Sequence, residues 1–227
     1  MDELAPQDEL LRALGKLVRG LSALFWGLPL TLLICVRTAM SDRLRPIEMF
    51  PPIVSTLLLY YGVTLLGDFQ KQERVWRLAL DRAKLLAVVN IGLSPFVYWW
   101  NQIPGISFYS MALGALMLSG LIFVFNLNHV LQRLAAMLPD ETLRMETRLF
   151  GAMNLNLLCA ILALVSLYVI LQEINTLPDF LIKFQRMLEV SRGWLLVFLI
   201  LLPIAMTMTL IWKTKEVIFA SVFTHRH

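Results

Sequence analysis

The sequence predicts an all-α fold, that of a polytopic membrane protein with six transmembrane helices. Two compositional observations support this: 58% of the 227 residues are hydrophobic and only 16% are charged, whereas soluble domains usually carry about 25% charged residues. The mean hydropathy is +0.70. The third observation is that the apolar residues form continuous runs. One helical crossing needs roughly 20 such residues, whereas a membrane β-barrel would show shorter, alternating segments.

Uncharged stretches of the chain delimit the individual spans. The longest of them, 85–128, is long enough for two crossings and contains a turn at Pro104-Gly105, preceded by Trp99-Trp100. Tryptophan is typical of the membrane interface, and Pro-Gly of a turn. The predicted spans are residues 20–36, 50–67, 85–101, 107–128, 149–172 and 193–212. Residues 1–19 form an amphipathic lead-in helix on the membrane surface, and residues 213–227 form a tail.

Three prolines lie near the middle of predicted spans. Pro29, Pro95 and Pro203 belong to spans one, three and six. Proline kinks a helix because it lacks a backbone N–H and clashes with the preceding turn. We interpret these kinks as static, with gating hinges as the alternative. Pro51-Pro52 is expected to begin the second span instead, where a missing N–H costs nothing.

The basic residues of the loops predict the orientation. In a six-span topology fourteen Lys and Arg residues lie on the side of the two termini and six lie on the other side. Loops rich in these residues stay in the cytoplasm. We therefore expect an integral membrane protein of the bacterial inner membrane with both termini in the cytoplasm.

Helices on the cytoplasmic side are expected to extend beyond the bilayer. Residues 68–84 contain no Gly or Pro and lead directly into the third span. The fourth span continues to Met137, and Asp140 is the expected N-cap of the helix that enters the fifth span. On the opposite side, residues 178–192 have one apolar face, which predicts an interfacial helix on the outer leaflet.

The sequence contains few features that could support chemistry. It has no phosphate-binding P-loop, no HExxH and no GxSxG motif, and no charged residue lies deep within a span. We predict no catalytic residue, no cofactor and no metal ion. A membrane enzyme is the least favoured class, with His129 and nearby amides as its candidate cluster. The net charge of +4 does not indicate nucleic-acid binding, because the basic residues form no dense patch.

A layer of amides is the candidate polar site. At 1.5 Å per residue, amides of spans three, four and five lie about 7–12 Å inward of the charged residues that bound these spans. An unbonded amide in hydrocarbon costs several kcal/mol, so these side chains should face one another, a partner or water. The candidate site consists of Asn90, Asn126, Asn128, His129, Asn154 and Asn156.

Two stripes of small and polar residues suggest how the amides are used. The stripe on the fourth span consists of Ala115, Ser119, Asn126, His129 and Arg133, and that on the fifth of Ala152, Asn156, Cys159 or Ala160, and Ala163. Small residues allow helices to approach closely. The favoured interpretation is that spans three to five pack through these stripes. A polar cavity for a ligand or headgroup and contact with a second membrane subunit remain as alternatives.

The cytoplasmic extensions contain the candidate docking residues. Trp76 lies among basic residues on the extension of the third span, where it could enter the headgroup layer or dock a soluble partner. The docking candidates are Trp76, Arg74, Arg77, Arg133 and Arg144. We therefore expect a non-catalytic subunit or scaffold of a larger membrane complex, with the lipid bilayer and other proteins as partners and no nucleic acid. The alternative is a transporter or channel for a neutral solute or lipid that uses the Asn-rich layer.

Overall fold

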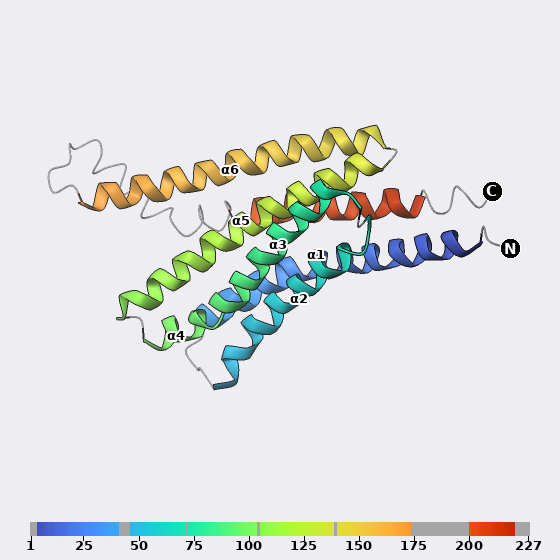
Figure 1. Ribbon diagram of the computed structural model, residues 1–227. Coiled ribbons are helices and arrows are strands. Elements are labelled where there is room, and N and C mark those ends of the chain that lie inside the picture. The colour runs from blue at the N-terminus through green and yellow to red at the C-terminus, as the bar shows by residue number, and fades with distance from the viewer. Residues whose placement is uncertain are drawn as a thin grey trace.

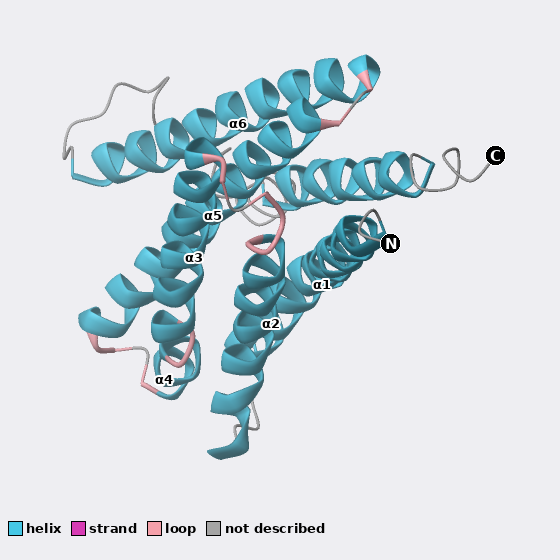
Figure 2. Ribbon diagram, turned by 45° about the vertical axis from the view of Figure 1, so that its right-hand side comes forward, coloured by secondary structure: helices cyan, strands magenta, loops and turns pink. Residues whose placement is uncertain are grey.

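The computed structural model describes residues 4–40, 46–70, 72–103, 105–138, 140–173 and 200–220. Their regular structure is entirely helical (Figure 2), which confirms the all-α prediction. The elements are α1 (Leu4–Met40), the short 3-10 helix η1 (Pro46–Met49), α2 (Phe50–Leu66), α3 (Arg74–Leu93), α4 (Phe96–Gln102), α5 (Ser107–Met137) and α6 (Glu141–Glu173). Residues 200–220 form a further helix.

Among the residues that the structure describes, four helical segments are long and apolar enough to cross a membrane. They are Arg12–Met40, Ile47–Leu66, Arg74–Gln102 and Ser107–Met137. These segments cover the first four predicted spans, except that the second segment ends at Leu66 and the second span was predicted to end at residue 67, and they fit an integral membrane protein. The count of six spans and the cytoplasmic orientation remain predictions. The expected outer helix at residues 178–192 and the beginning of the sixth predicted span lie outside the described residues.

The helix boundaries follow from particular residues. Pro51 and Pro52 occupy the first turn of α2, where proline removes no helical hydrogen bond. The helix containing the third span begins at Arg74 rather than at Asp68, because Gln70 adopts a φ of 45° and turns the chain. The predicted extension of this helix is therefore shorter. Pro95 separates α3 from α4, as expected for a residue that cannot donate to the preceding turn.

The segments that were predicted to share one side of the membrane share one end of the molecule. The start of α1, the α2–α3 turn, the α5–α6 turn and the end of the 200–220 helix all lie toward the right in Figure 1. Two ion pairs join them. Lys16 of α1 lies 2.6 Å from Asp68, and Lys213 lies 2.6 Å from Glu146 of α6. We call this end of the bundle the basic end.

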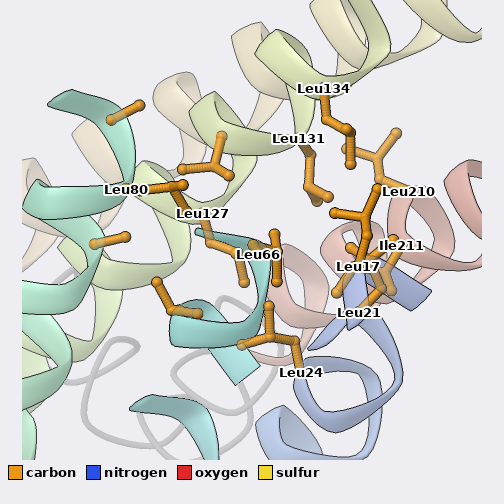
Figure 3. Close-up of a cluster of buried hydrophobic side chains, with 14 of the residues drawn as sticks. Leu17, Leu21, Leu24, Leu66, Leu80, Leu127, Leu131, Leu134, Leu210 and Ile211 are labelled. Atoms are coloured by element: carbon orange, nitrogen blue, oxygen red, sulfur yellow. The ribbon is translucent and has the colours of Figure 1, made fainter. Parts of the chain in front are cut away.

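Among the described residues, a leucine-rich core joins α1, α2, α3, α5 and the 200–220 helix, and reaches α6 through Leu143. Figure 3 shows the side chains that meet there: Leu17, Leu21 and Leu24 of α1, Leu66 of α2, Leu80 of α3, Leu127, Leu131 and Leu134 of α5, and Leu210 and Ile211 of the 200–220 helix. The predicted lead-in, residues 1–19, and the first span belong to one helix, which begins at Leu4. Because Leu17 is fully buried in this core, its side chain is not available to a membrane surface.

Helices α1 and α2 approach closely through glycine. A Cβ atom at Gly20 would lie 2.8 Å from the carbonyl oxygen of Gly62 and 2.7 Å from Cδ1 of Leu66. Lipid tails are as apolar as leucine, so close packing rather than transfer from water stabilises such contacts within a bilayer. The glycines permit that packing.

Candidate functional site

The amide of Asn128 is buried, and its nitrogen is hydrogen-bonded within the protein. Its side chain is 1% exposed. Nδ2 donates to the hydroxyl oxygen of Thr207 at 2.9 Å and to the carbonyl oxygen of Val124 at 3.1 Å. The Thr207 hydroxyl in turn donates to the carbonyl oxygen of Pro203 at 2.7 Å. Asn128 therefore joins α5 to the 200–220 helix.

Two further amides are buried without complete hydrogen bonding. Asn154 of α6 is 3% exposed, and neither its Nδ2 nor its Oδ1 has a partner among the described residues. Asn90 of α3 is 5% exposed, and its Oδ1 has none. Asn154 lines a cavity of about 10 Å³ next to Pro203 and Phe125, which is about the space that one water molecule occupies. In this conformation the cavity has room for one water molecule beside the Asn154 amide and is too small for a solute.

The remaining members of the predicted layer lie at the periphery. Asn126 is half-buried and donates to the carbonyl oxygen of Ile122 of its own helix at 2.9 Å. His129 is also half-buried, and Asn156 is exposed. The structure thus divides the six residues into a buried group of three, Asn90, Asn128 and Asn154, and an outer group of three, rather than bringing all six into one site.

The stripe predicted to pack on the fifth span faces outward instead. Ala152, Asn156, Cys159, Ala160 and Ala163 are all exposed. The packing interpretation is therefore wrong for this stripe. The face of α6 that is buried contains Leu143, Thr147, Gly151, Asn154 and Ile161.

Gly151 makes room for a contact between this face of α6 and α5. The Nε2 atom of Gln132 donates to the carbonyl oxygen of Thr147 at 3.0 Å, and it lies only 1.6 Å from the position that a Cβ atom of residue 151 would occupy. Any larger residue would exclude the Gln132 side chain. The sequence shows both Gln132 and Gly151. Glycine is common in membrane helices, however, so its presence alone did not identify this contact between helices.

Two of the predicted docking residues are used inside the fold. Trp76 is fully buried and packs edge-on against Phe69, with 6.4 Å between ring centroids. It cannot dock a partner or enter headgroups from this position. Arg144 donates from Nη2 to the carbonyl oxygen of Leu138 at 2.9 Å, which caps the C-terminal end of α5. Its guanidinium is thereby engaged at the α5–α6 turn.

The other docking candidates remain at the surface. Arg74 and Arg77 on α3 and Arg133 on α5 are exposed at the basic end. Sequence reasoning did not include Arg82 among them, although it is exposed on α3 and its charge acts on the same His129 ring as that of Arg133. This proximity depends on how α3 and α5 pack, which the sequence did not reveal.

A larger hollow lies away from the amides. It measures about 350 Å³, lies between α1 and α2, and is lined mainly by apolar side chains such as Leu30, Val54 and Tyr61. Within the described part of the chain, no three His, Cys, Asp or Glu side chains come together in an arrangement that could hold a metal ion. Searches of protein-family models, curated proteins and solved structures find no match to this chain.

Proposed function

We propose that the protein is a non-catalytic integral membrane subunit whose α6 helix binds a membrane helix of a partner protein. One observation carries this proposal. The outward stripe of α6, formed by Ala152, Asn156, Cys159 and Ala163, is exposed. We refer to it as the α6 stripe.

The chemistry of the α6 stripe favours a helix as its partner. Small residues allow two helix backbones to approach closely, and an amide between them can form a hydrogen bond across the contact. Asn156 lies about 12 Å inward of Arg148 along the predicted span. An amide exposed to hydrocarbon at that depth costs several kcal/mol, and a polar group on a partner helix would offset this cost.

The same face continues to the start of the predicted span at Leu149 and beyond it at Met145. Met145 and Leu149 are 77% and 61% exposed, and both precede the α6 stripe at helical spacing. A partner helix that bound Asn156 would therefore also cover apolar side chains at the basic end. This agrees with the expectation that partners dock at the cytoplasmic extensions, but it adds a binding surface within the membrane.

Crosslinking from Cys159 tests the proposal. The chain has two cysteines, so Cys35→Ala leaves Cys159 on the α6 stripe as the only thiol. A thiol-attached photo-crosslinker at this position should join the chain to one other membrane protein in native membranes. We expect Asn156→Leu to remove the adduct.

Asn126→Leu is the matched control, because it makes the same chemical change in an amide that already bonds within its own helix. It should leave the adduct intact. Adducts with lipid alone, an adduct between two copies of this chain, or a protein adduct that survives Asn156→Leu would each contradict the proposal.

Transport of a neutral solute is the second candidate, and the unpartnered amide of Asn154 favours it. The cavity beside Asn154 is small, but it adjoins Pro203, where a proline could act as a hinge. In this case, proteoliposomes containing the protein should swell in glycerol, and Asn154→Leu should abolish the swelling while Asn126→Leu, which lies outside the cavity lining, leaves it unchanged. Equal swelling of the wild type and of protein-free liposomes would exclude glycerol transport.

A further inference from the structure

The hollow between α1 and α2 is a groove of about 350 Å³. Both helices belong to segments that are long and apolar enough to cross a membrane, Arg12–Met40 and Ile47–Leu66. Within a bilayer the groove therefore faces hydrocarbon. Its lining consists of Leu30 and Ile34 of α1 and Val54, Ser55, Leu57, Leu58 and Tyr61 of α2. We call it the α1–α2 groove.

Contacts between the two helices fix the walls of the groove. A Cβ atom at Gly27 would lie 2.9 Å from Cδ2 of Leu59, so the helices approach closely beside the groove. The Thr31 hydroxyl donates to the carbonyl oxygen of Ser55 at 3.0 Å. Ser55 lines the groove but is only 2% exposed, which places this bond at its base. The two walls are thus held at a fixed separation.

The groove contains one hydroxyl group without a partner. Of the side chains that line it, only those of Ser55 and Tyr61 are polar. The Ser55 hydroxyl donates to the carbonyl oxygen of Pro52 at 3.0 Å. The Tyr61 hydroxyl forms no hydrogen bond with any described residue. Because an unbonded hydroxyl in hydrocarbon is costly, a ligand that accepts a hydrogen bond from Tyr61 would be stabilised.

The depth of Tyr61 decides which lipid can supply this acceptor. Tyr61 lies six residues before Gly67, the last residue of the predicted second span, and thus about 9 Å inside the apolar layer. Its side chain leans toward the N-terminal end of α2, which lies away from the basic end, so the hydroxyl lies deeper still. Phospholipid ester and phosphate oxygens lie outside the hydrocarbon core. At this depth a phospholipid offers only its acyl chains.

We propose that the α1–α2 groove binds an isoprenoid quinone, with a ring carbonyl oxygen accepting a hydrogen bond from the Tyr61 hydroxyl. A quinone ring has acceptors and no donor, and its isoprenoid tail keeps it within hydrocarbon. The volume of about 350 Å³ is at the lower end of the range for small-molecule sites, so the groove holds the ring and the start of the tail. The groove is separate from the α6 stripe, so this inference does not depend on the function proposed above.

Ligand retention in native mass spectrometry tests this site. The full-length protein is reconstituted in phosphatidylcholine nanodiscs that contain increasing amounts of either a short-chain menaquinone or squalene, an isoprenoid hydrocarbon without a carbonyl group. We expect the released protein to carry one menaquinone molecule and no squalene. Phosphatidylcholine is in excess throughout, so its acyl chains compete for the groove in every sample.

Tyr61→Phe isolates the contribution of the hydroxyl. It should weaken menaquinone retention about fivefold, as expected for the loss of one hydrogen bond. Tyr60→Phe is the matched control, because Tyr60 packs against the core and does not line the groove. This control should retain menaquinone as the wild type does.

A second pair of variants tests the groove itself. Val54→Trp introduces a large ring at an exposed position of the lining and should abolish retention. Val88→Trp makes the same change at an exposed position of α3 outside the groove and should have no effect. Circular dichroism verifies that all four variants remain folded.

Several results would each overturn the proposal. A wild type that carries no menaquinone would show that acyl chains fill the groove. Full retention in Tyr61→Phe or in Val54→Trp would show that menaquinone binds elsewhere or without the hydroxyl. Retention of squalene equal to that of menaquinone would show that the groove accepts hydrocarbon alone. Equal losses in Tyr61→Phe and Tyr60→Phe would show that the effect is not specific to the groove.

Discussion

The side chain of Asn128 on α5 donates a 2.9 Å hydrogen bond to the hydroxyl oxygen of Thr207, 79 residues later in the chain. Both residues are buried. The bond satisfies an amide that would otherwise be costly in an apolar environment, and it fixes the 200–220 helix against α5. Asn128, a member of the predicted polar layer, therefore has a structural role.

This bond predicts a measurable coupling between the two residues. Thr207→Val should lower the free energy of unfolding by about 1–2 kcal/mol, because it leaves the Asn128 amide without its partner. Asn128→Leu combined with Thr207→Val should cost less than the sum of the single changes, with a coupling of about 0.6–1.7 kcal/mol. Unfolding by SDS in mixed micelles measures all three variants. Strict additivity would show that the bond does not contribute.

The contact of Gln132 with Gly151 predicts an unusual sensitivity to a single methyl group. In Gly151→Ala the new Cβ would occupy the place of Gln132 Nε2, so the hydrogen bond to Thr147 should be lost and the free energy of unfolding should fall by about 1–3 kcal/mol. Gly120→Ala is the control, because a Cβ there would meet no atom within 4 Å. It should be neutral or slightly stabilising, since alanine favours helix. Equal effects of the two changes would contradict this interpretation.

The burial of Trp76 predicts that its volume matters more than its polar atom. The ring is fully buried, and its Nε1 has no partner in the described structure. Trp76→Ala should therefore cost about 3–5 kcal/mol of unfolding free energy. Trp76→Phe should cost much less, because it keeps most of the ring and removes the unsatisfied N–H. If Trp76→Ala were as stable as the wild type, the side chain would not belong to the core.

The N-cap of α6 predicts a response to acid. Asp140 Oδ1 accepts hydrogen bonds from the backbone N–H of Thr142 at 2.9 Å and of Leu143 at 3.2 Å. The Thr142 hydroxyl, followed by the Leu143 N–H, lowers the pKa of Asp140 from its ordinary value of 3.8. Because the folded pKa is the lower one, the stabilisation is complete above the ordinary value and is lost as the pH falls through the folded value.

Hydrogen exchange at the Leu143 amide measures this effect. Below the lowered pKa, protection of the amide should fall in the wild type relative to Asp140→Asn, whose side chain caps a helix without titrating. Above the ordinary value the two proteins should be equally protected. Identical profiles for the two proteins across the acid range would mean that the Asp140 carboxylate does not hold the end of the helix.

Composition and local chemistry predicted the helices well. Long uncharged runs predicted six spans, and four described segments are long and apolar enough to cross a membrane. Residues with special backbone chemistry, Pro51, Pro95 and Asp140, predicted where helices begin or break. These features depend only on neighbouring residues. For this reason they can be inferred from the sequence alone.

The packing faces could not be inferred in the same way. Asn154 and Asn156 lie two residues apart, so they point to nearly opposite sides of α6. Because both residues are asparagine and both sides are otherwise apolar, the sequence does not show which side is buried. The buried side is the one with Gly151, which contacts Gln132 on another helix. Trp76 was likewise misplaced because its burial depends on the turn at Gln70, which brings Phe69 against it.

The mass of the native assembly tests the proposed role as a membrane subunit most directly. The protein is extracted from its own membranes into polymer-bounded nanodiscs, without detergent, and the released complex is weighed by native mass spectrometry. We predict a complex heavier than the 26.0 kDa chain by one constant partner mass, which Asn156→Leu reduces to the single chain and Asn126→Leu does not. Recovery of the wild type as a lone 26.0 kDa chain would contradict the proposal.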